Sequence, residues 1–326
     1  MAPDDYAEGI RTIQKAISIF RDLGETHWEA FSLWLLARFY DKTGDVARAY
    51  QVSQDALTLC QNTHNILRMG FVLRYMGIFA YKLGYTEQTE QCMNQSLNIF
   101  RQLESNDLGY HEVYLSKGFY RALDGDFSSA LNFAKKALFH ASRVNYPGQT
   151  ANSWQLLNIL HLVIGNYPEA IRCACQGMQT MIDTGSPVIR ADFHKAVGEA
   201  CGRYGLGEND AAAALVREHF APWNTRYDLR NFDIVIQDYH LTGLAYLLAD
   251  AGEAERALEL ISLAVHQPYT PDWWLEREPL TVKLLARLKG CLSSAQYAAA
   301  WERGKSLDLN AALAALLDLP SLQKKR

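Results

Sequence analysis

The 326-residue sequence has no long hydrophobic run and no strong excess of either charge. No stretch approaches the ~18 consecutive apolar residues of a membrane span. The N-terminal sequence MAPDDYAEG has neither the basic nor the apolar part of a signal peptide. Lys and Arg number 32 against 36 Asp and Glu, so nothing attracts phosphate backbones or anionic lipids broadly. We therefore expect neither direct nucleic-acid binding nor membrane attachment.

Cysteines are few and none forms a C-x-x-C motif, which argues against a disulfide framework and a redox pair. Single cysteines within helical patterns are typical of buried thiols in reducing compartments. The sequence therefore predicts reduced cysteines and a cytoplasmic location. The six are Cys60, Cys92, Cys173, Cys175, Cys201 and Cys291.

Short catalytic, cofactor and metal motifs are also lacking. The sequence contains no H-E-x-x-H, no His–Cys pair at zinc spacing, no G-x-S-x-G and no glycine-rich dinucleotide fingerprint. Gly304, Lys305 and Ser306 resemble the end of a phosphate-binding loop, but Ala299 stands where that loop needs its first glycine. We expect no metal, no cofactor and no catalytic residues, and hence not an enzyme.

A repeat is what the sequence does contain. Glycines recur at nearly constant intervals of about 40 residues, and similar residue types return at fixed offsets around each of them. A later unit, centred on Gly252, repeats the same offsets. The regularly spaced glycines are Gly44, Gly84, Gly125, Gly165 and Gly205.

The unit around Gly44 illustrates the offsets. Before the glycine, apolar and small residues are spaced as on one face of a helix, and after it small residues return at helical spacing. The residues are Leu33, Leu36, Ala37, Tyr40, Val46, Ala49 and Ala56. Small residues let two antiparallel helices approach closely, and glycine suits the left-handed turn that ends the first helix. Each unit therefore predicts a helical hairpin that needs a neighbouring hairpin to cover it.

These offsets resemble the tetratricopeptide pattern W-x2-L-G-x2-Y…G…A over residues 4–270. The longer period resembles the repeats that follow the nucleotide switch of STAND-class signalling ATPases, which include the maltose-type transcription regulators. The ending Gly290–Leu317, with its A-W-x-x-G-x-x-L motif, is similar to the closing segment of many such regulators. The resemblance implies an all-α, right-handed superhelical solenoid, continuous from the array (residues 1–270) into capping helices (residues 271–326).

Several segments depart from the template. Residues 4–23 fit only as the second helix of a hairpin, so we expect a longer protein whose first helix precedes them. Residues 186–223 are irregular, through either a kink or simple sequence drift. Three prolines interrupt residues 267–279, where Trp273 and Trp274 are expected to fill the end of the core.

Polar residues also replace the usual aromatic four positions before the turn glycine in two units. These are Arg121 and His161, which either extend past the core or mark a polar pocket.

Candidate binding residues are those that the template assigns to the inner, concave side of the first helices. Aromatic rings with interleaved Arg, Asn and Gln suit a groove that binds a peptide or a sugar, although they are equally compatible with an ordinary helix surface. The predicted positions are Phe31, Trp34, Arg38, Phe71, Arg74, Tyr81, Glu112, Phe119, Asn152, Gln155, Asp192, Lys195, Tyr239, Thr242 and Tyr246.

The favoured function is a non-enzymatic sensor: the ligand-detecting arm of a STAND-type ATPase or transcription regulator. Its expected partners are an inducer, which is a peptide, protein or small molecule, and the nucleotide-binding switch domain of the full protein. The alternative is a free-standing tetratricopeptide scaffold or peptide receptor. If the groove is correct, replacing Trp34 and Arg74 together by Ala weakens binding and leaves helical content intact.

Overall fold

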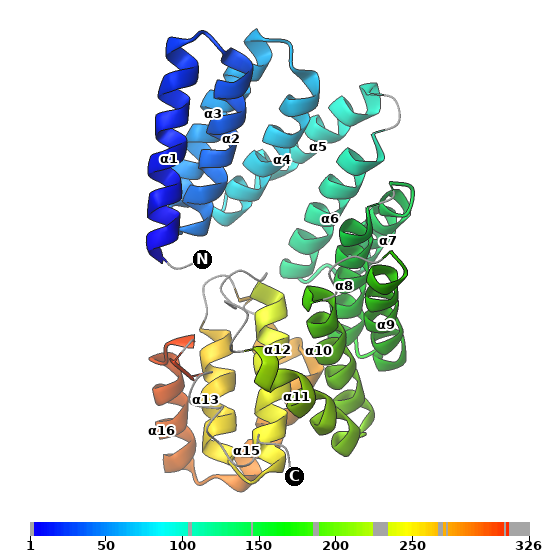
Figure 1. The fold of residues 1–326 in the computed structure, drawn as a ribbon. Helices are drawn as coiled ribbons and strands as arrows, with labels where there is room; N and C mark the ends of the chain where they lie inside the picture. Colours follow the sequence, from blue (N-terminus) through cyan, green and yellow to red (C-terminus); the bar gives the residue numbers. More distant parts are fainter. Residues whose placement is uncertain are drawn as a thin grey trace. The chain divides into compact units, whose positions relative to one another are not determined.

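The computed structural model describes residues 3–103, 106–144, 146–184, 189–223, 234–266, 270–271, 273–309 and 311–312. Across these residues the chain is helical and contains no strand (Figure 1). The helices of this described part are α1 (Pro3–Asp22), α2 (Thr26–Lys42), α3 (Val46–Asn62), α4 (Ile66–Lys82), α5 (Thr86–Gln102), α6 (Asp107–Leu123), α7 (Phe127–Ala141), α8 (Pro147–Val163), α9 (Tyr167–Asp183), α10 (Ile189–Leu206), α11 (Asn209–Trp223), α12 (Ile234–Asp250), α13 (Ala254–Val265), α14 (Trp274–Arg277), α15 (Pro279–Cys291) and α16 (Ser294–Lys305).

The turn glycines end the first helix of each hairpin, as the repeat predicted. Gly44 has a backbone φ of 85°, a value that residues other than glycine rarely adopt. The amide of Gly44 donates to the carbonyl of Asp41, and that of Asp45 donates to the carbonyl of Tyr40 at 2.9 Å. These bonds satisfy carbonyls that the end of α2 would leave unpaired. Gly84, Gly125, Gly165 and Gly252 also have positive φ values.

The prediction for Gly205 is wrong. Gly205 lies inside α10, and the positive φ of 81° belongs to Gly207, so the helix continues past the expected turn. A Cβ atom at Gly205 would meet the ring of Tyr167 at 2.4 Å. Glycine is therefore required at position 205 for close packing of α10 on α9, whereas Gly207 makes the turn.

Consecutive helices pack as hairpins through the small residues of the template. The pairs α2 with α3, α4 with α5, and α8 with α9 make extensive contacts. Ala37 and Ala49 are fully buried between α2 and α3. A Cβ atom at Gly77 of α4 would lie 2.9 Å from the Met93 side chain of α5. The absence of larger side chains at these columns allows the close approach.

The chain divides into two compact units. The first consists of residues 1–120 and 139–144, and the second of residues 121–138 and 145–326. In the first unit, α1 to α5 pack around apolar residues such as Leu36 and Phe79. In the second, α8 to α13, α15 and α16 enclose a core that includes Leu247.

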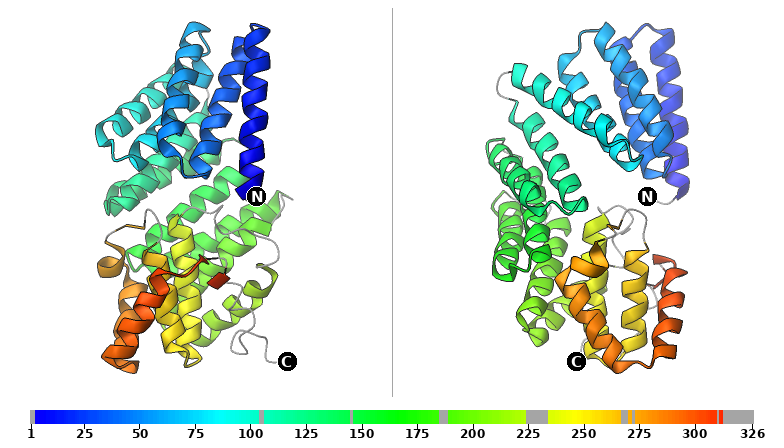
Figure 2. Two further views of the ribbon diagram at one scale, coloured as in Figure 1. Left: turned by 90° about the vertical axis from the view of Figure 1, so that its left-hand side faces the viewer. Right: turned by 180° about the vertical axis from the view of Figure 1, so that it is seen from behind.

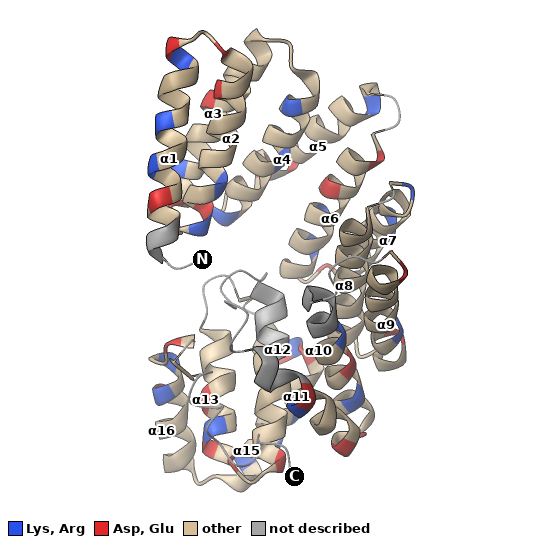
Figure 3. Cartoon of the chain, viewed as in Figure 1, with Lys and Arg blue, Asp and Glu red and all other residues tan. Residues whose placement is uncertain are grey.

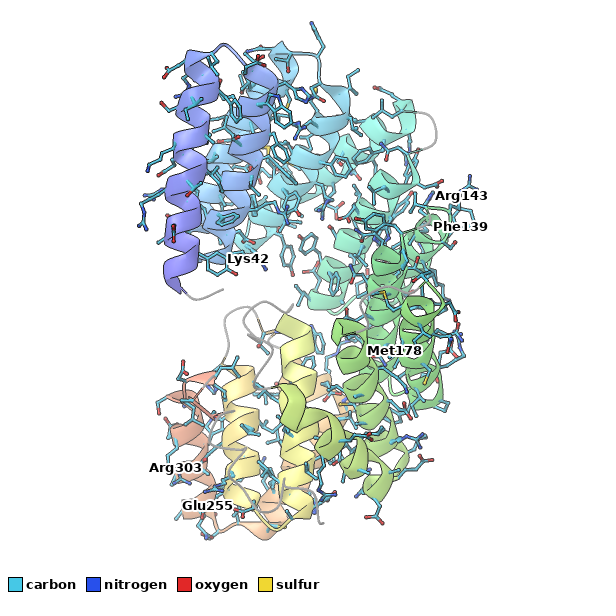
Figure 4. The ribbon with its side chains drawn as sticks, in the orientation of Figure 1. Lys42, Phe139, Arg143, Met178, Glu255 and Arg303 are labelled. Carbon is cyan, nitrogen blue, oxygen red and sulfur yellow. The ribbon has the colours of Figure 1, made fainter. Side chains whose placement is uncertain are left out.

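The C-terminal helices α15 and α16 cover α13 within the second unit, as both views in Figure 2 show. Gly304 allows α16 to lie close to α13, because a Cβ atom there would meet the Glu259 carbonyl oxygen at 2.5 Å. The Ser262 hydroxyl of α13 donates to the Trp301 carbonyl at 2.6 Å. The glycine of the A-W-x-x-G motif thus permits helix packing. Figure 4 places Arg303 of α16 beside Glu255 of α13, and their ion pair spans 2.6 Å.

The two neighbouring tryptophans fill the core where the prolines interrupt the helical pattern. Trp274 is buried, and its indole donates to the Thr281 hydroxyl at 3.0 Å. Trp273 is partly buried against Phe127, and its indole donates to the carbonyl of Leu123 at 2.8 Å. The predicted position of Trp274 at the core is confirmed. None of the helices in the described residues has the length and apolar character required to cross a bilayer.

Candidate functional site

An aromatic and cationic cluster covers one side of α2 and α4 in the first unit. The rings of Phe31 and Trp34 lie 5.6 Å apart, and Trp34 meets Tyr75 edge-on at 5.6 Å. The Arg38 guanidinium lies over both Trp34 and Tyr75, at 4.9 and 5.2 Å from the ring centroids. The indole nitrogen of Trp34 is buried without a hydrogen-bond partner. Phe31, Trp34 and Arg38, all predicted binding residues, are therefore brought together and half-buried.

Arg74 and Glu112, two further predicted binding residues, form an ion pair with each other. Arg74 is 8% exposed, and its Nη2 lies 2.9 Å from Glu112 Oε2. Its Nη1 donates to the Ser116 hydroxyl at 3.0 Å, and its guanidinium lies over the ring of Tyr75. These contacts join α4 to α6. Replacing Arg74 by Ala would break these contacts, so we expect the variant to lose stability. This differs from the sequence-based prediction that the Trp34 and Arg74 double variant keeps its helical content.

The remaining predicted residues of the first unit are three half-buried aromatic residues. Phe71 meets the buried ring of Phe100 at 5.0 Å. Tyr81 stacks on Tyr120 at 4.3 Å. Phe119 follows on α6 and is also half-buried. The rings of Phe71 and Tyr81 thus connect α4 to α5 and to α6, and whether any of the three residues contacts a ligand stays a prediction.

A pocket of about 230 Å³ lies between α8, α9 and α10 in the second unit. Three predicted binding residues, Asn152, Gln155 and Lys195, line it together. Asn152 and Gln155 come from α8 and Lys195 from α10, whereas α9 contributes Met178, which is labelled in Figure 4. The other lining residues are Tyr146, Gly148, Gln149, Ala151, Asn158, Cys173, Ala174, Gly177 and Met181.

Asn158 joins the three helices that form the pocket. Its buried side-chain amide donates to the Ala170 carbonyl of α9 at 2.8 Å. Gly198 of α10 packs directly on it, since a Cβ atom there would meet Asn158 Oδ1 at 2.5 Å. Gly177 likewise brings α9 against α8, because its Cβ would lie 3.3 Å from Trp154 Cβ. The pocket walls are thus held by close backbone packing.

Lys195 supplies the positive charge of the pocket. The Glu199 carboxylate is held mainly by Arg203, whose Nη2 lies 2.7 Å from Oε1, whereas Lys195 Nζ lies 3.9 Å from Oε2. The Lys195 side chain is 37% exposed. Its weak pairing leaves the ammonium group able to approach an acceptor in the pocket. Figure 3 shows basic and acidic residues interspersed on the helices, so this is a local charge.

The four remaining predicted residues belong to α10 and α12. Thr242 and Tyr246 are buried, and the Tyr246 hydroxyl donates to the Leu280 carbonyl of α15 at 2.9 Å. They pack in the core, so we do not include them in the candidate site. The side chains of Asp192 and Tyr239 lie outside the described residues.

Sequence reasoning did not identify one polar group, formed by His161 of α8 with Glu169 and Cys173 of α9. One donor atom from each lies within 4.8 Å of the other two. The signal available in the sequence was His161 itself, at a position where the template has an aromatic. Arg121, the other such residue, has 36% of its side chain exposed and lies 3.9 Å from Asp124. It therefore extends past the core.

No protein-family model matches this sequence, and no curated protein matches it either. The site is consequently assigned from its own geometry. It combines four amide side chains, one ammonium group and apolar walls, and this arrangement can hold a ligand by hydrogen bonds, charge and apolar contact.

Proposed function

We propose that the chain is a non-enzymatic binding module whose ligand occupies the pocket between α8, α9 and α10. The observation that carries this proposal is the convergence of Asn152, Gln155 and Lys195 on one pocket with an apolar wall at Met178. Small-molecule sites in proteins typically combine apolar walls with a few polar groups that set orientation. The residues face each other across three helices that are held in contact by glycines, so little rearrangement is needed for binding.

The size and charge of the pocket suggest the class of ligand. Its volume of about 230 Å³ is below the ~300–1,000 Å³ of pockets for drug-sized ligands. A single ammonium group, from Lys195, favours an anionic group, and the amides of Asn152 and Gln155 can donate or accept hydrogen bonds. We therefore infer a small metabolite with one carboxylate or phosphate and a short apolar part.

The proposal has a larger architectural setting. We propose that the hairpins form a right-handed solenoid of the tetratricopeptide type, with a period of about 40 residues, and serve as the sensor arm of a STAND-type switch protein. The turn glycines, the close-packed hairpins and the A-W-x-x-G ending support this reading. The coding sequence upstream of Met1 tests it: a phosphate-binding loop followed by an acidic strand would support it, and a stop codon would refute it.

A thermal-shift screen of small carboxylates and phosphates tests the pocket. A ligand that binds only the native state at a hundred times its Kd adds about 2.7 kcal/mol of stability, which raises Tm measurably. Ala151→Leu fills the pocket from α8, and Lys195→Ala removes its charge. Both variants are expected to abolish or weaken the shift. Ala299→Leu, the same change on the exposed face of α16, is the matched control and should leave it unaltered.

An unchanged shift in both pocket variants would show that the ligand binds elsewhere. Failure of every acidic small molecule to raise Tm would refute the proposed ligand class.

The cluster of Phe31, Trp34 and Arg38 favours a second function, that of a peptide receptor. Aromatic residues and Arg are enriched at protein-binding surfaces, and here the Arg38 guanidinium lies over the ring of Trp34. A peptide whose binding is weakened by Arg38→Ala and unaffected by Ala151→Leu would favour this alternative.

A further inference from the structure

His161, Glu169 and Cys173 bring three different metal-ligating groups together at one hairpin. His161 lies near the end of α8, and Glu169 and Cys173 lie one turn apart on α9. One donor atom of each residue lies within 4.8 Å of the other two. Cys173 is 1% exposed, and the group therefore differs from a cluster of acidic side chains on the surface.

The imidazole of His161 adds an independent observation. Its Nδ1 atom is shielded from solvent and has no hydrogen-bond partner. A buried polar atom without a partner destabilises the folded state and calls for an explanation. The corresponding position of the first hairpin holds Tyr40, which is buried in the core. A metal ion bonded to Nδ1 would supply the missing partner.

The donor set indicates which metals fit. Imidazole nitrogen, thiolate sulfur and carboxylate oxygen are the ligands of Zn²⁺, and three of them leave the fourth tetrahedral position to water or another molecule. Mg²⁺ and Ca²⁺ prefer oxygen ligands only. We propose that His161, Glu169 and Cys173 bind a divalent transition metal of the zinc class in a three-ligand site.

Metal binding requires a local exchange of partners. Both carboxylate oxygens of Glu169 accept hydrogen bonds from Arg172, Oε2 from Nε at 2.9 Å and Oε1 from Nη2 at 2.5 Å, so the metal must replace this guanidinium at one oxygen or both. Arg172 also lies over the ring of Trp154, at 5.3 Å from its centroid, which gives the released guanidinium a second contact. Zn²⁺–ligand bonds are about 2.0–2.3 Å long. Donor atoms that are now up to 4.8 Å apart must therefore move closer together around the ion. The rotatable Glu169 side chain can make most of this movement.

Burial and neighbouring charges both act on the His161 and Cys173 side chains. Burial lowers the pKa of His161, so its neutral form, which coordinates metals, prevails at neutral pH. Lys135 and Arg172 add positive charge and also lower that pKa, whereas Glu169 raises it. Burial raises the pKa of Cys173 to about 12. A metal ion that bonds to the Cys173 sulfur displaces the thiol proton into solvent.

The metal site does not depend on the ligand proposed for the pocket, although Cys173 also lines the pocket. Its test therefore uses the metal alone. The full chain carries Cys291→Ser, because the exposed Cys291 thiol would otherwise bind metal on its own. Co²⁺ reports thiolate coordination by an intense near-ultraviolet absorption, and Zn²⁺ stoichiometry is measured after dialysis.

The expected result is one bound metal per chain, with the Co²⁺–thiolate absorption lost in Cys173→Ser. Changes to groups that only support metal ligands lower affinity about 10–100-fold. Loss of a ligand should therefore cost at least about a hundredfold, and His161→Gln should show this. Cys175→Ser removes a thiol two residues further along the same helix and serves as the matched control, which should bind normally.

Stability measurements keep the test decisive if a buried variant folds poorly. Zn²⁺ should raise the Tm of the parent chain and of Cys175→Ser. Glu169→Gln alters a carboxylate that is 34% exposed, so it should fold and still bind Zn²⁺ more weakly. Absence of stoichiometric metal binding in the parent chain would overturn the proposal. So would a thiolate absorption that persists in Cys173→Ser or disappears in Cys175→Ser.

Discussion

Replacing Arg74 with alanine is predicted to destabilise the first unit by about 3 kcal/mol. Breaking a buried ion pair by removing one partner costs about 3–5 kcal/mol, because the other charge is left uncompensated. Arg74 is 8% exposed, whereas the side chain of Glu112 is 17% exposed. Water can therefore reach the orphaned carboxylate in part, which favours the lower end of the range. The Ser116 hydroxyl would also lose the hydrogen bond it accepts from Arg74.

A double variant separates the value of the pair from the cost of orphaning one member. Replacing a buried ion pair by apolar residues of similar volume is often neutral or stabilising. Arg74→Met combined with Glu112→Leu should therefore be more stable than either Arg74→Ala or Arg74→Met alone. The difference is a coupling free energy between the two positions, and a double-mutant cycle measures it.

Hydrogen exchange of the α4 and α6 amides is the appropriate assay, since two compact units need not unfold in one transition. Urea unfolding followed by circular dichroism provides the global comparison. Arg101→Ala is the control, because Arg101 is exposed on α5 and its loss should change stability by less than ~0.5 kcal/mol. The reasoning is refuted if Arg74→Ala costs under about 1 kcal/mol, or if the double variant is less stable than Arg74→Ala.

Two further predictions concern the same unit. Gly109→Ala should destabilise it, although alanine is favoured over glycine within a helix by about 1 kcal/mol. Its Cβ would meet three atoms of the buried Phe100 ring at 2.4–2.6 Å, and overpacking costs about 1–3 kcal/mol. Gly290→Ala is the control, because a Cβ atom there would meet nothing within 4 Å, and it should be neutral or stabilising in urea unfolding. Equal changes in stability for Gly109→Ala and Gly290→Ala would contradict the packing argument. Separately, a hydrogen bond from His140 lowers the pKa of Asp107. A carboxyl with a depressed folded-state pKa stabilises the fold above its unfolded pKa, and this contribution is lost as pH falls through the folded value. Urea midpoints of the parent chain should drop in that acidic range, whereas Asp107→Asn should show less of this drop; identical pH profiles would refute the assignment.

The turns and the hairpin cores could be predicted from the sequence because both follow from local geometry. A left-handed turn favours glycine, and close helix approach requires small residues at helical spacing. The failure at Gly205 has a specific cause. The sequence offers two glycines, Gly205 and Gly207, and only the Tyr167 ring, which belongs to the preceding hairpin, reveals that the first is needed for packing. Such contacts between hairpins are not visible in periodicity.

The candidate pocket was predictable only in part. The inner column of the template placed Asn152 and Gln155 on one face of α8, because residues three apart on a helix are neighbours. It did not predict that α9 would contribute Met178 to the same pocket. It also placed Thr242 and Tyr246 on an open face, whereas α15 covers Tyr246 and accepts its hydroxyl hydrogen bond. That covering helix lies beyond the repeat, so the offsets contain no information about it.

Departures from the template are more informative about function than agreement with it. Core columns of a repeat are apolar because neighbouring hairpins bury them, so a polar residue there must be satisfied or it destabilises the fold. Two such residues, Asn158 and His161, occur one turn apart on α8. The Asn158 amide has a protein partner in the Ala170 carbonyl, whereas the His161 Nδ1 atom has no hydrogen-bond partner. The pocket and the group around Cys173 both adjoin this turn. The two polar residues thus lie where the pocket meets the group formed by His161, Glu169 and Cys173. Ligand and metal binding are therefore best tested by substitutions in the hairpin of α8 and α9.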